Sequence, residues 1–239
     1  MTSNARALKS YPHLSQRGDN VNNAGRGDRG RLIMLQLSDS AFPTGGFAHS
    51  NGLEAAWQQG EVEDLAAWLE QLVWQTGFSA LPFVSDAFDE PASLRELDAR
   101  CEAFLSNLAA KRASRLQGQA FLAACAAAFG EKRLEGWAKR PFHHAPAFGA
   151  ACAALGLPKR EAQRLFLFLG LRGSLSAGVR LGVVGPLEAQ RLLAKAAPVL
   201  EAALERCAAI GSEDAAQTAP LHDLFQGTQD RLYSRLFQS

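Results

Sequence analysis

The 239-residue chain can bury one substantial hydrophobic core, since 47% of its residues are hydrophobic. Its 25 basic and 24 acidic residues give a formal net charge of +1. This balance excludes bulk charge as a reason to bind nucleic acid or a membrane surface, and we expect neither as a partner.

Membrane insertion and secretion are not expected from the sequence. No apolar run approaches the roughly 18–20 residues that cross a bilayer. The first residues lack the apolar core and small-residue cleavage site of a secretory signal. The four cysteines stand far apart among alanines and leucines without a CxxC pair, which is typical of buried thiols in a reducing compartment. We therefore expect a cytoplasmic protein.

Residues 1–30 are rich in Ser, Asn, Gly and Arg and have no apolar period, so we expect a flexible N-terminal tail. From residue 31 onward Ala and Leu are abundant, while apolar–polar alternation never lasts long enough for a strand. The sequence therefore predicts an all-α fold, with residues 31–239 forming a single globular domain of about ten helices.

The first predicted helices follow from capping signals. Asn51 and Glu54 have the spacing of a capping box, which predicts a helix from about residue 52 to residue 60. Asp64 can cap the next helix, whose apolar face includes Trp68 and Leu72. A short helix over 81–90 is expected to follow.

The later helices are predicted from apolar spacing, proline and glycine. A helix opening near Pro91 and Ser93 is expected to extend to Leu108, and another to run from about 114 to 129, with Gly130 as its stop. Residues 130–144 are expected to form an irregular joint. Further helices are predicted over 146–155, 158–173 and 174–184, and a last long one from Pro186. Residues 211–219 form a polar linker before the terminal segment 220–239.

The stretch QLSDSAFPTGGFAHSNGLEAA, residues 36–56, places a glycine–proline turn in front of a helix. It does not fit a phosphate loop, because Phe47 and Ala48 follow the glycines where Lys and Ser or Thr are required. Asp39, His49 and Ser50 superficially form a catalytic set, but there is no nucleophile-elbow pattern. Turn formation explains them better: Asp39 can cap backbone N–H groups, one glycine can take a positive φ, and Ser50 can help cap the helix.

Two further groups of polar residues are better explained by structural roles than by chemistry. His143 and His144 are adjacent, so they point in different directions, and no neighbouring motif completes a metal site. A histidine pair in a structural joint is expected, although a transient nickel contact stays open. The cluster of Lys111, Arg112 and Arg115 is typical of a solvated face.

The terminal RLYSRLF is amphipathic. Leu232 with Leu236, and Tyr233 with Phe237, form i, i+4 apolar pairs beside Arg231 and Arg235. Such a segment either docks into a groove of a partner or folds back on its own domain.

Four blocks in order give the chain a family resemblance over about residues 32–239: LQLSDSAFPTGGFAHSNGLEAA, KRASRLQGQAFL, SAGVRLGVVGPLEAQRLL and RLYSRLFQS. Together they resemble the urease accessory protein F (UreF) family, although Asn51 stands where an aromatic or small residue is more usual. The resemblance implies an all-helical, non-enzymatic homodimer without a cofactor. It also implies a scaffold that joins a UreD/UreH-type protein and recruits the GTPase UreG, for GTP-dependent nickel insertion into the urease apoprotein.

The resemblance also suggests which residues bind partners. Roles at the turn and at the terminal docking segment 220–239 carry over to Asp39, Ser40, Pro43, Gly45, Gly46, Phe47, His49, Ser50, Glu54, Arg231, Tyr233, Ser234, Arg235 and Phe237. No catalytic residue is expected. Two alternatives stay open from the residues themselves: a metal-dependent hydrolase using His49, His143, His144 and Glu54, and a carrier that binds nickel itself.

Overall fold

The computed structural model describes the backbone of residues 21–239 and side chains from Asp28 onward. Within this range the elements are helices and short 3-10 turns, with no strand, which confirms the predicted all-α fold. The α-helices are α1 Val21–Ser38, α2 Leu53–Gln58, α3 Leu65–Ser79, α4 Leu81–Asp89, α5 Leu94–Phe104, α6 Leu108–Phe129, α7 Lys132–Trp137, α8 His144–Ala154, α9 Lys159–Arg180, α10 Pro186–Lys195, α11 Ala197–Cys207 and α12 Pro220–Thr228.

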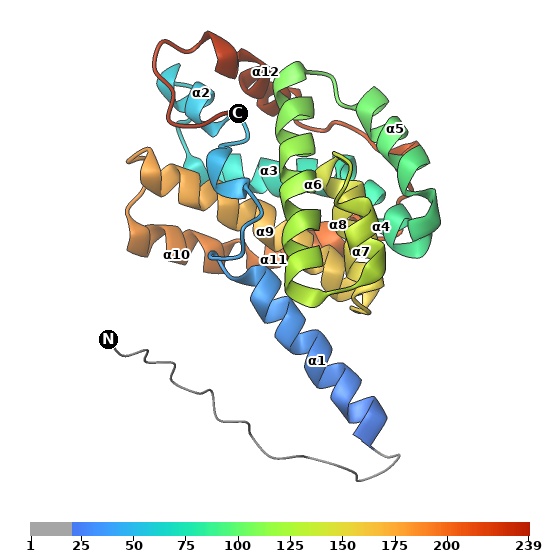
Figure 1. The fold of residues 1–239 in the computed structure, drawn as a ribbon. Coiled ribbons are helices and arrows are strands. Elements are labelled where there is room, and N and C mark those ends of the chain that lie inside the picture. The colour runs from blue at the N-terminus through green and yellow to red at the C-terminus, as the bar shows by residue number, and fades with distance from the viewer. Residues whose placement is uncertain (1–20) are drawn as a thin grey trace, which may run out of the picture.

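Helix α8 lies inside the bundle, between α4 and α6 and against α9 (Figure 1). Residues 145–152 are all buried, because this helix is composed almost entirely of alanine, glycine and other apolar residues. Small side chains allow backbones to approach closely. A Cβ added at Gly149 would lie 2.1 Å from the carbonyl oxygen of Val84, so glycine is required where α8 crosses α4.

A second, smaller apolar cluster joins distant parts of the chain. It contains Leu53 and Ala56 of α2, Trp68 of α3, Phe225 of α12 and Phe237 near the chain end. Figure 1 accordingly shows α2 and the C-terminal segment side by side at one end of the bundle. This cluster positions the candidate site, because it brings the residue 39–50 turn and residues 229–239 to the same end.

Several predicted helix boundaries are wrong, and each has a local cause. The helix predicted to reach Leu108 ends at Phe104, since the Asn107 side chain accepts a hydrogen bond from Ala110 N and starts α6. The predicted joint contains α7, which Glu131 caps through Arg133 N.

Two further boundaries concern the second half of the bundle. The helices predicted over 158–173 and 174–184 form one continuous helix, α9, because no proline or left-handed residue interrupts it. The predicted last long helix is divided at Ala196 into α10 and α11, since Pro198 has no N–H to continue the hydrogen-bond ladder. The predicted caps at Asp64 and Gly130 are confirmed: Asp64 accepts from Ala66 N, and Gly130 has φ 63°.

Helix α1 extends away from the bundle (Figure 1). It begins at Val21, so residues 21–30 of the predicted tail are helical, whereas residues 1–20 lie outside the described part. Ile33 and Leu37 are buried against the bundle, but Leu32 and Leu35 are each 66% exposed. Across the described residues, no helix combines the length and apolar character needed to cross a membrane.

Candidate partner-binding site

The turn over residues 39–50, called here the signature turn, is held by its own polar groups. Asp39 Oδ1 accepts a hydrogen bond from Ala41 N at 2.8 Å, as predicted for a turn residue. Gly45 has φ 73°, the left-handed conformation expected of one of the two glycines. The turn presents Phe47 with 70% of its surface exposed, and Asp39, Ser40, Pro43 and Gly45 are exposed as well.

The start of α2 differs from the predicted capping box. Gly52, with φ 86°, is the N-cap, and Asn51 lies before the helix with a positive φ of 54°. Ser50 Oγ accepts a hydrogen bond from Glu54 N at 3.3 Å, which confirms the predicted capping role of Ser50. The Glu54 carboxylate therefore remains available for other donors.

Glu54 holds the segment 229–239, called here the tail. Its carboxylate is buried, with the residue only 1% exposed. Oε1 accepts from Leu236 N at 2.5 Å, and Oε2 accepts from Phe237 N at 3.0 Å. Gln229 Nε2, which is also buried, donates to Oε2 at 2.5 Å. One side chain of α2 thus satisfies three donors from the tail, and we call this arrangement the Glu54 hub.

The end of the tail is fixed against the signature turn. Ser50 N and Ser50 Oγ donate to the backbone oxygen of Ser239 at 2.5 and 3.0 Å, and Gln238 N donates to Ala48 O at 2.8 Å. A hydrogen bond of 2.8 Å joins His49 Nδ1 to Ser239 Oγ. Residues about 190 positions apart in sequence therefore form one continuous structure.

Arg180, at the end of α9, lies between the two aromatic rings of this site. Its guanidinium carbon is 3.8 Å from the centre of the Phe47 ring and 4.2 Å from that of Phe237. Its Nη1 also donates to Phe47 O. A guanidinium over an aromatic face is attracted by the ring's electrons, so Arg180 connects turn and tail.

The predicted i, i+4 pairs of the tail are wrong. After α12 a 3-10 turn covers Gln229–Arg231, and residues 232–239 are not helical. Phe237 enters the smaller apolar cluster, whereas Tyr233 is fully exposed. Of the two predicted alternatives for this segment, the structure shows it folded back on its own domain.

The residues proposed as partner-binding divide into two groups. His49, Ser50, Glu54 and Phe237 are buried and contact their own chain, whereas Arg231, Tyr233, Ser234 and Arg235 are exposed, as are several of the turn residues. Gly46 is half-buried. Sequence reasoning missed Gln229 and Arg180, because nothing in the local pattern of either residue indicates its distant partner.

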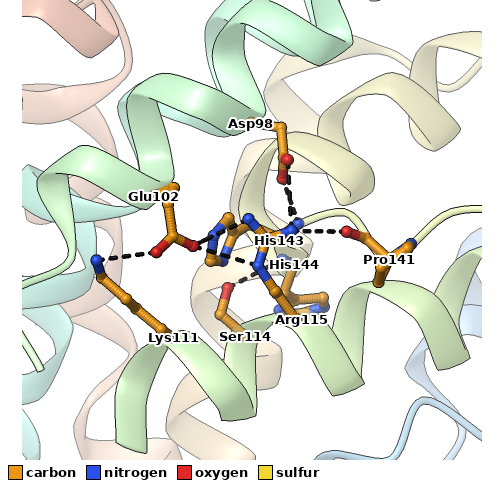
Figure 2. A network of polar contacts seen from close by, with 8 residues as sticks. All are labelled: Asp98, Glu102, Lys111, Ser114, Arg115, Pro141, His143 and His144. Atoms are coloured by element: carbon orange, nitrogen blue, oxygen red, sulfur yellow. Dashed lines mark hydrogen bonds and ion pairs between the residues drawn. The ribbon is translucent and has the colours of Figure 1, made fainter. Parts of the chain in front are cut away.

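A second polar cluster lies at the joint between α5, α6 and α8 (Figure 2). Glu102 accepts hydrogen bonds from Lys111 Nζ at 2.9 Å, Arg115 Nη2 at 2.9 Å and His143 Nε2 at 2.9 Å. Arg115 also donates to Pro141 O at 2.7 Å. The prediction of a merely solvated face is therefore wrong for Lys111 and Arg115: Arg115 holds the segment leading into α8 directly, and Lys111 binds Glu102, which holds His143.

The backbone of that segment is held in the same way. Asp98 Oδ1 accepts from His143 N at 2.7 Å, and Ser114 Oγ accepts from His144 N at 3.1 Å (Figure 2). Burial lowers the pKa of His143, although its hydrogen bond to Glu102 opposes that effect. Because His143 Nδ1 is buried and has no hydrogen-bond partner among the described residues, a second ring proton would be unsatisfied and the neutral form is favoured.

Three histidines line one cavity of about 410 Å³ beneath the signature turn: His49, His144 and His222. Burial lowers the pKa of each to about 4, so all three are neutral at pH 7. Their pKa values in the folded chain lie below the ordinary histidine value of 6.5, so the unfolded chain binds more protons than the folded chain in acid. These histidines therefore make the fold less stable as pH falls from about 6.5 towards 4.

The structure separates the residues of the alternative chemistries. Asp39 binds Ala41 N, whereas His49 and Ser50 bind Ser239, so the three do not assemble as a catalytic set. His143 is directed at Glu102, while His144 packs against Phe121, Phe148 and Phe166. Among the described residues, no group of His, Cys, Asp and Glu is arranged to hold a metal ion.

The Glu102 cluster predicts a specific pH dependence of stability. The Lys111 hydrogen bond, supported by His143 and Arg115, lowers the pKa of Glu102 from 4.5 to about 2. This depressed pKa contributes stability above pH 4.5 that is lost as pH falls towards 2. Glu102→Gln should lower the free energy of unfolding at neutral pH, by less than the shift alone implies, because Glu102 is partly exposed to solvent.

Urea unfolding of both chains across this pH range measures the effect. The difference between wild type and Glu102→Gln should shrink as the solution is acidified, because protonated Glu102 loses its ionic partners. A difference that is constant with pH would show that the carboxylate charge is not what stabilises this joint.

Fold and site together define an all-helical protein whose buried polar residues hold its own backbone and leave aromatic and cationic side chains exposed at one end. The UreF family model matches residues 60–197. The chain is 40% identical over 215 residues to urease accessory protein F of Oryza sativa subsp. indica, covering 84% of this chain and 82% of the relative. It is 41% identical over 217 residues to the Arabidopsis thaliana protein of that name, covering 85% and 90%.

A bacterial relative extends the similarity. The urease accessory protein UreF of Arthrobacter sp. (strain FB24) is 32% identical over 218 residues, covering 87% of this chain and 97% of the relative. The chain belongs to the UreF family of urease accessory proteins. The relatives named above are urease accessory proteins.

Proposed function

We propose that this chain is a non-catalytic scaffold of urease maturation in the cytoplasm. It joins a UreD/UreH-type protein and recruits the GTPase UreG, so that nickel is inserted into the urease apoprotein with GTP hydrolysis. Family membership supports the general role. The observation that carries the particular role is the Glu54 hub, which fixes the tail beside the signature turn without using its exposed side chains.

The two groups of residues have different roles in this proposal. Glu54, Ser50, His49 and Phe237 hold the turn and tail in one arrangement, and the exposed residues contact a partner. Fixing a binding segment beforehand removes ordering costs of about 0.5–1.5 kcal/mol for each side chain that association would otherwise immobilise. Exposed aromatic residues such as Phe47 and Tyr233 are the type that often dominates binding energy.

We also propose that the chain works as a homodimer. Most of the stability of a helix in a protein comes from packing its apolar face against other elements rather than from intrinsic propensity. Helix α1 nevertheless extends from the bundle with Leu32 and Leu35 exposed three residues apart on its surface. A second copy would cover these leucines, and light scattering of the purified chain measures whether the dimer forms.

Co-purification tests the scaffold role. The chain, a UreD/UreH-type protein and UreG from the same organism should form one assembly in the presence of GTP. A chain lacking residues 231–239 serves as the comparison, because it removes the exposed tail residues but leaves α12 intact. If wild type forms no such assembly with or without GTP, the proposed scaffold role is wrong.

A further inference from the structure

The tail presents exposed apolar side chains although it is fixed on both sides. Gln229 and Phe237 are buried, and Gln58 Nε2 donates to Ser234 O at 3.1 Å between them. Tyr233 is fully exposed and Leu236 is 50% exposed within this fixed segment. These residues, with Phe47, Arg231 and Arg235, are called here the tail face. Its apolar side chains, Phe47, Tyr233 and Leu236, are accessible to another molecule.

The charges around the tail are predominantly positive. Four arginines lie in the tail or contact it, namely Arg112, Arg180, Arg231 and Arg235. The side-chain carboxylates in this set are Glu54 and Asp230, and Glu54 is buried within its hub. A single exposed carboxylate, Asp230, therefore accepts from Arg112 at 2.9 Å and from Arg235 at 2.8 Å.

This sharing leaves excess positive charge at the surface. One carboxylate can neutralise only one of its two guanidinium partners, while Arg231 adds a further exposed cation. A partner with carboxylates at matching positions would be attracted over a distance and aligned as it approached, whereas a basic partner would be repelled.

We infer that the tail face binds an acidic surface of the partner protein, on which carboxylates surround an apolar pocket that accepts Tyr233 and Leu236. The inference rests on the proposed function, because it specifies the chemistry of a partner of the same site. Arg231 and Arg235 supply attraction and orientation, and the aromatic and leucine side chains supply the area that is desolvated.

The association kinetics of the full-length chain with the UreD/UreH-type protein test this inference. Arg231→Glu should reduce the association rate constant about tenfold at about 0.15 M ionic strength. The defect should largely disappear at about 1 M, where the screening length falls from about 8 Å to about 3 Å. Arg95→Glu, at an exposed position of α5 remote from α2 in Figure 1, is the matched control and should associate like wild type.

The outcomes separate the two levels of proposal. Equal rates for wild type, Arg231→Glu and Arg95→Glu, with Tyr233→Ala still impairing binding, would overturn the acidic-partner inference and leave the scaffold role intact. Equal slowing by Arg231→Glu and Arg95→Glu would also overturn it, because overall charge would then explain the effect. Failure of the wild-type chain to bind would instead count against the proposed function.

Discussion

Glu54→Ala is expected to release the tail from the bundle. In the native chain, Leu236 N, Phe237 N and Gln229 Nε2 all donate to this one carboxylate. Each buried donor left without an acceptor costs about 1–3 kcal/mol. The tail can avoid that cost by separating from the bundle, which exposes these donors to water. The loss of stability is therefore limited to the free energy with which the tail docks on the bundle.

Hydrogen exchange measures this release directly. Amides of residues 236–238 should exchange at least about tenfold faster in Glu54→Ala, since about 1.4 kcal/mol corresponds to a factor of ten. Amides of the buried helix α8 should be unchanged. Binding of the partner protein should also weaken in this variant, because the exposed side chains of the released tail lose their fixed arrangement.

Two variants make the result interpretable. Glu61→Ala removes an exposed carboxylate just beyond α2 and should leave exchange at the tail unchanged. Glu54→Gln keeps one carbonyl acceptor but directs an amide N–H₂ at the remaining donors, so it should not restore protection. Native protection of residues 236 and 237 in Glu54→Ala would show that the hub does not hold the tail.

Gly118→Ala, which adds one methyl group to α6, is expected to cause a large loss of global stability. A Cβ at this position would lie 2.1 Å from Phe142 O, 2.9 Å from His143 C and 3.0 Å from His144 N. These are backbone atoms, so no side-chain rotation relieves the overlap. Helix α6 or residues 142–144 must move, which disturbs the bonds from His143 N to Asp98 and from His144 N to Ser114.

The expected net cost is about 2–4 kcal/mol, because overpacking and broken hydrogen bonds exceed the helix-propensity gain of about 1 kcal/mol for Gly to Ala. Gly170→Ala is the matched control. Gly170 also lies inside a long helix, but a Cβ there meets no atom within 4 Å, so this change should be neutral or stabilising. Urea denaturation compares the stability of the two variants. A Gly118→Ala variant that is as stable as wild type would contradict the packing described at this joint.

Local sequence signals predicted features that depend on neighbouring residues. Asp64 and Gly130 were identified as helix ends because capping is completed within a few residues. The same reasoning failed where two signals competed. Asn51 has a capping residue's chemistry, but Gly52 adopts φ 86° and lies against α12, where a Cβ would be 2.9 Å from His222 O. Tertiary packing therefore decided how α2 begins.

The tail shows the same limit more strongly. Its apolar spacing predicted helical i, i+4 pairs, yet residues 232–239 are held by a carboxylate about 180 positions earlier in the chain. Hydrogen bonds to Glu54 and burial of Phe237 replace the bonds that a helix would have supplied. No local pattern contains that information.

By itself the sequence determined that this chain is helical, where most helices occur, and that its motifs are those of UreF, because periodicity, caps and ordered motifs are local properties. Only the tertiary structure decided which motif residues are buried supports and which remain exposed. That division depends on contacts between the signature turn, α2, Arg180 and the tail, and such contacts arise only when distant segments pack together.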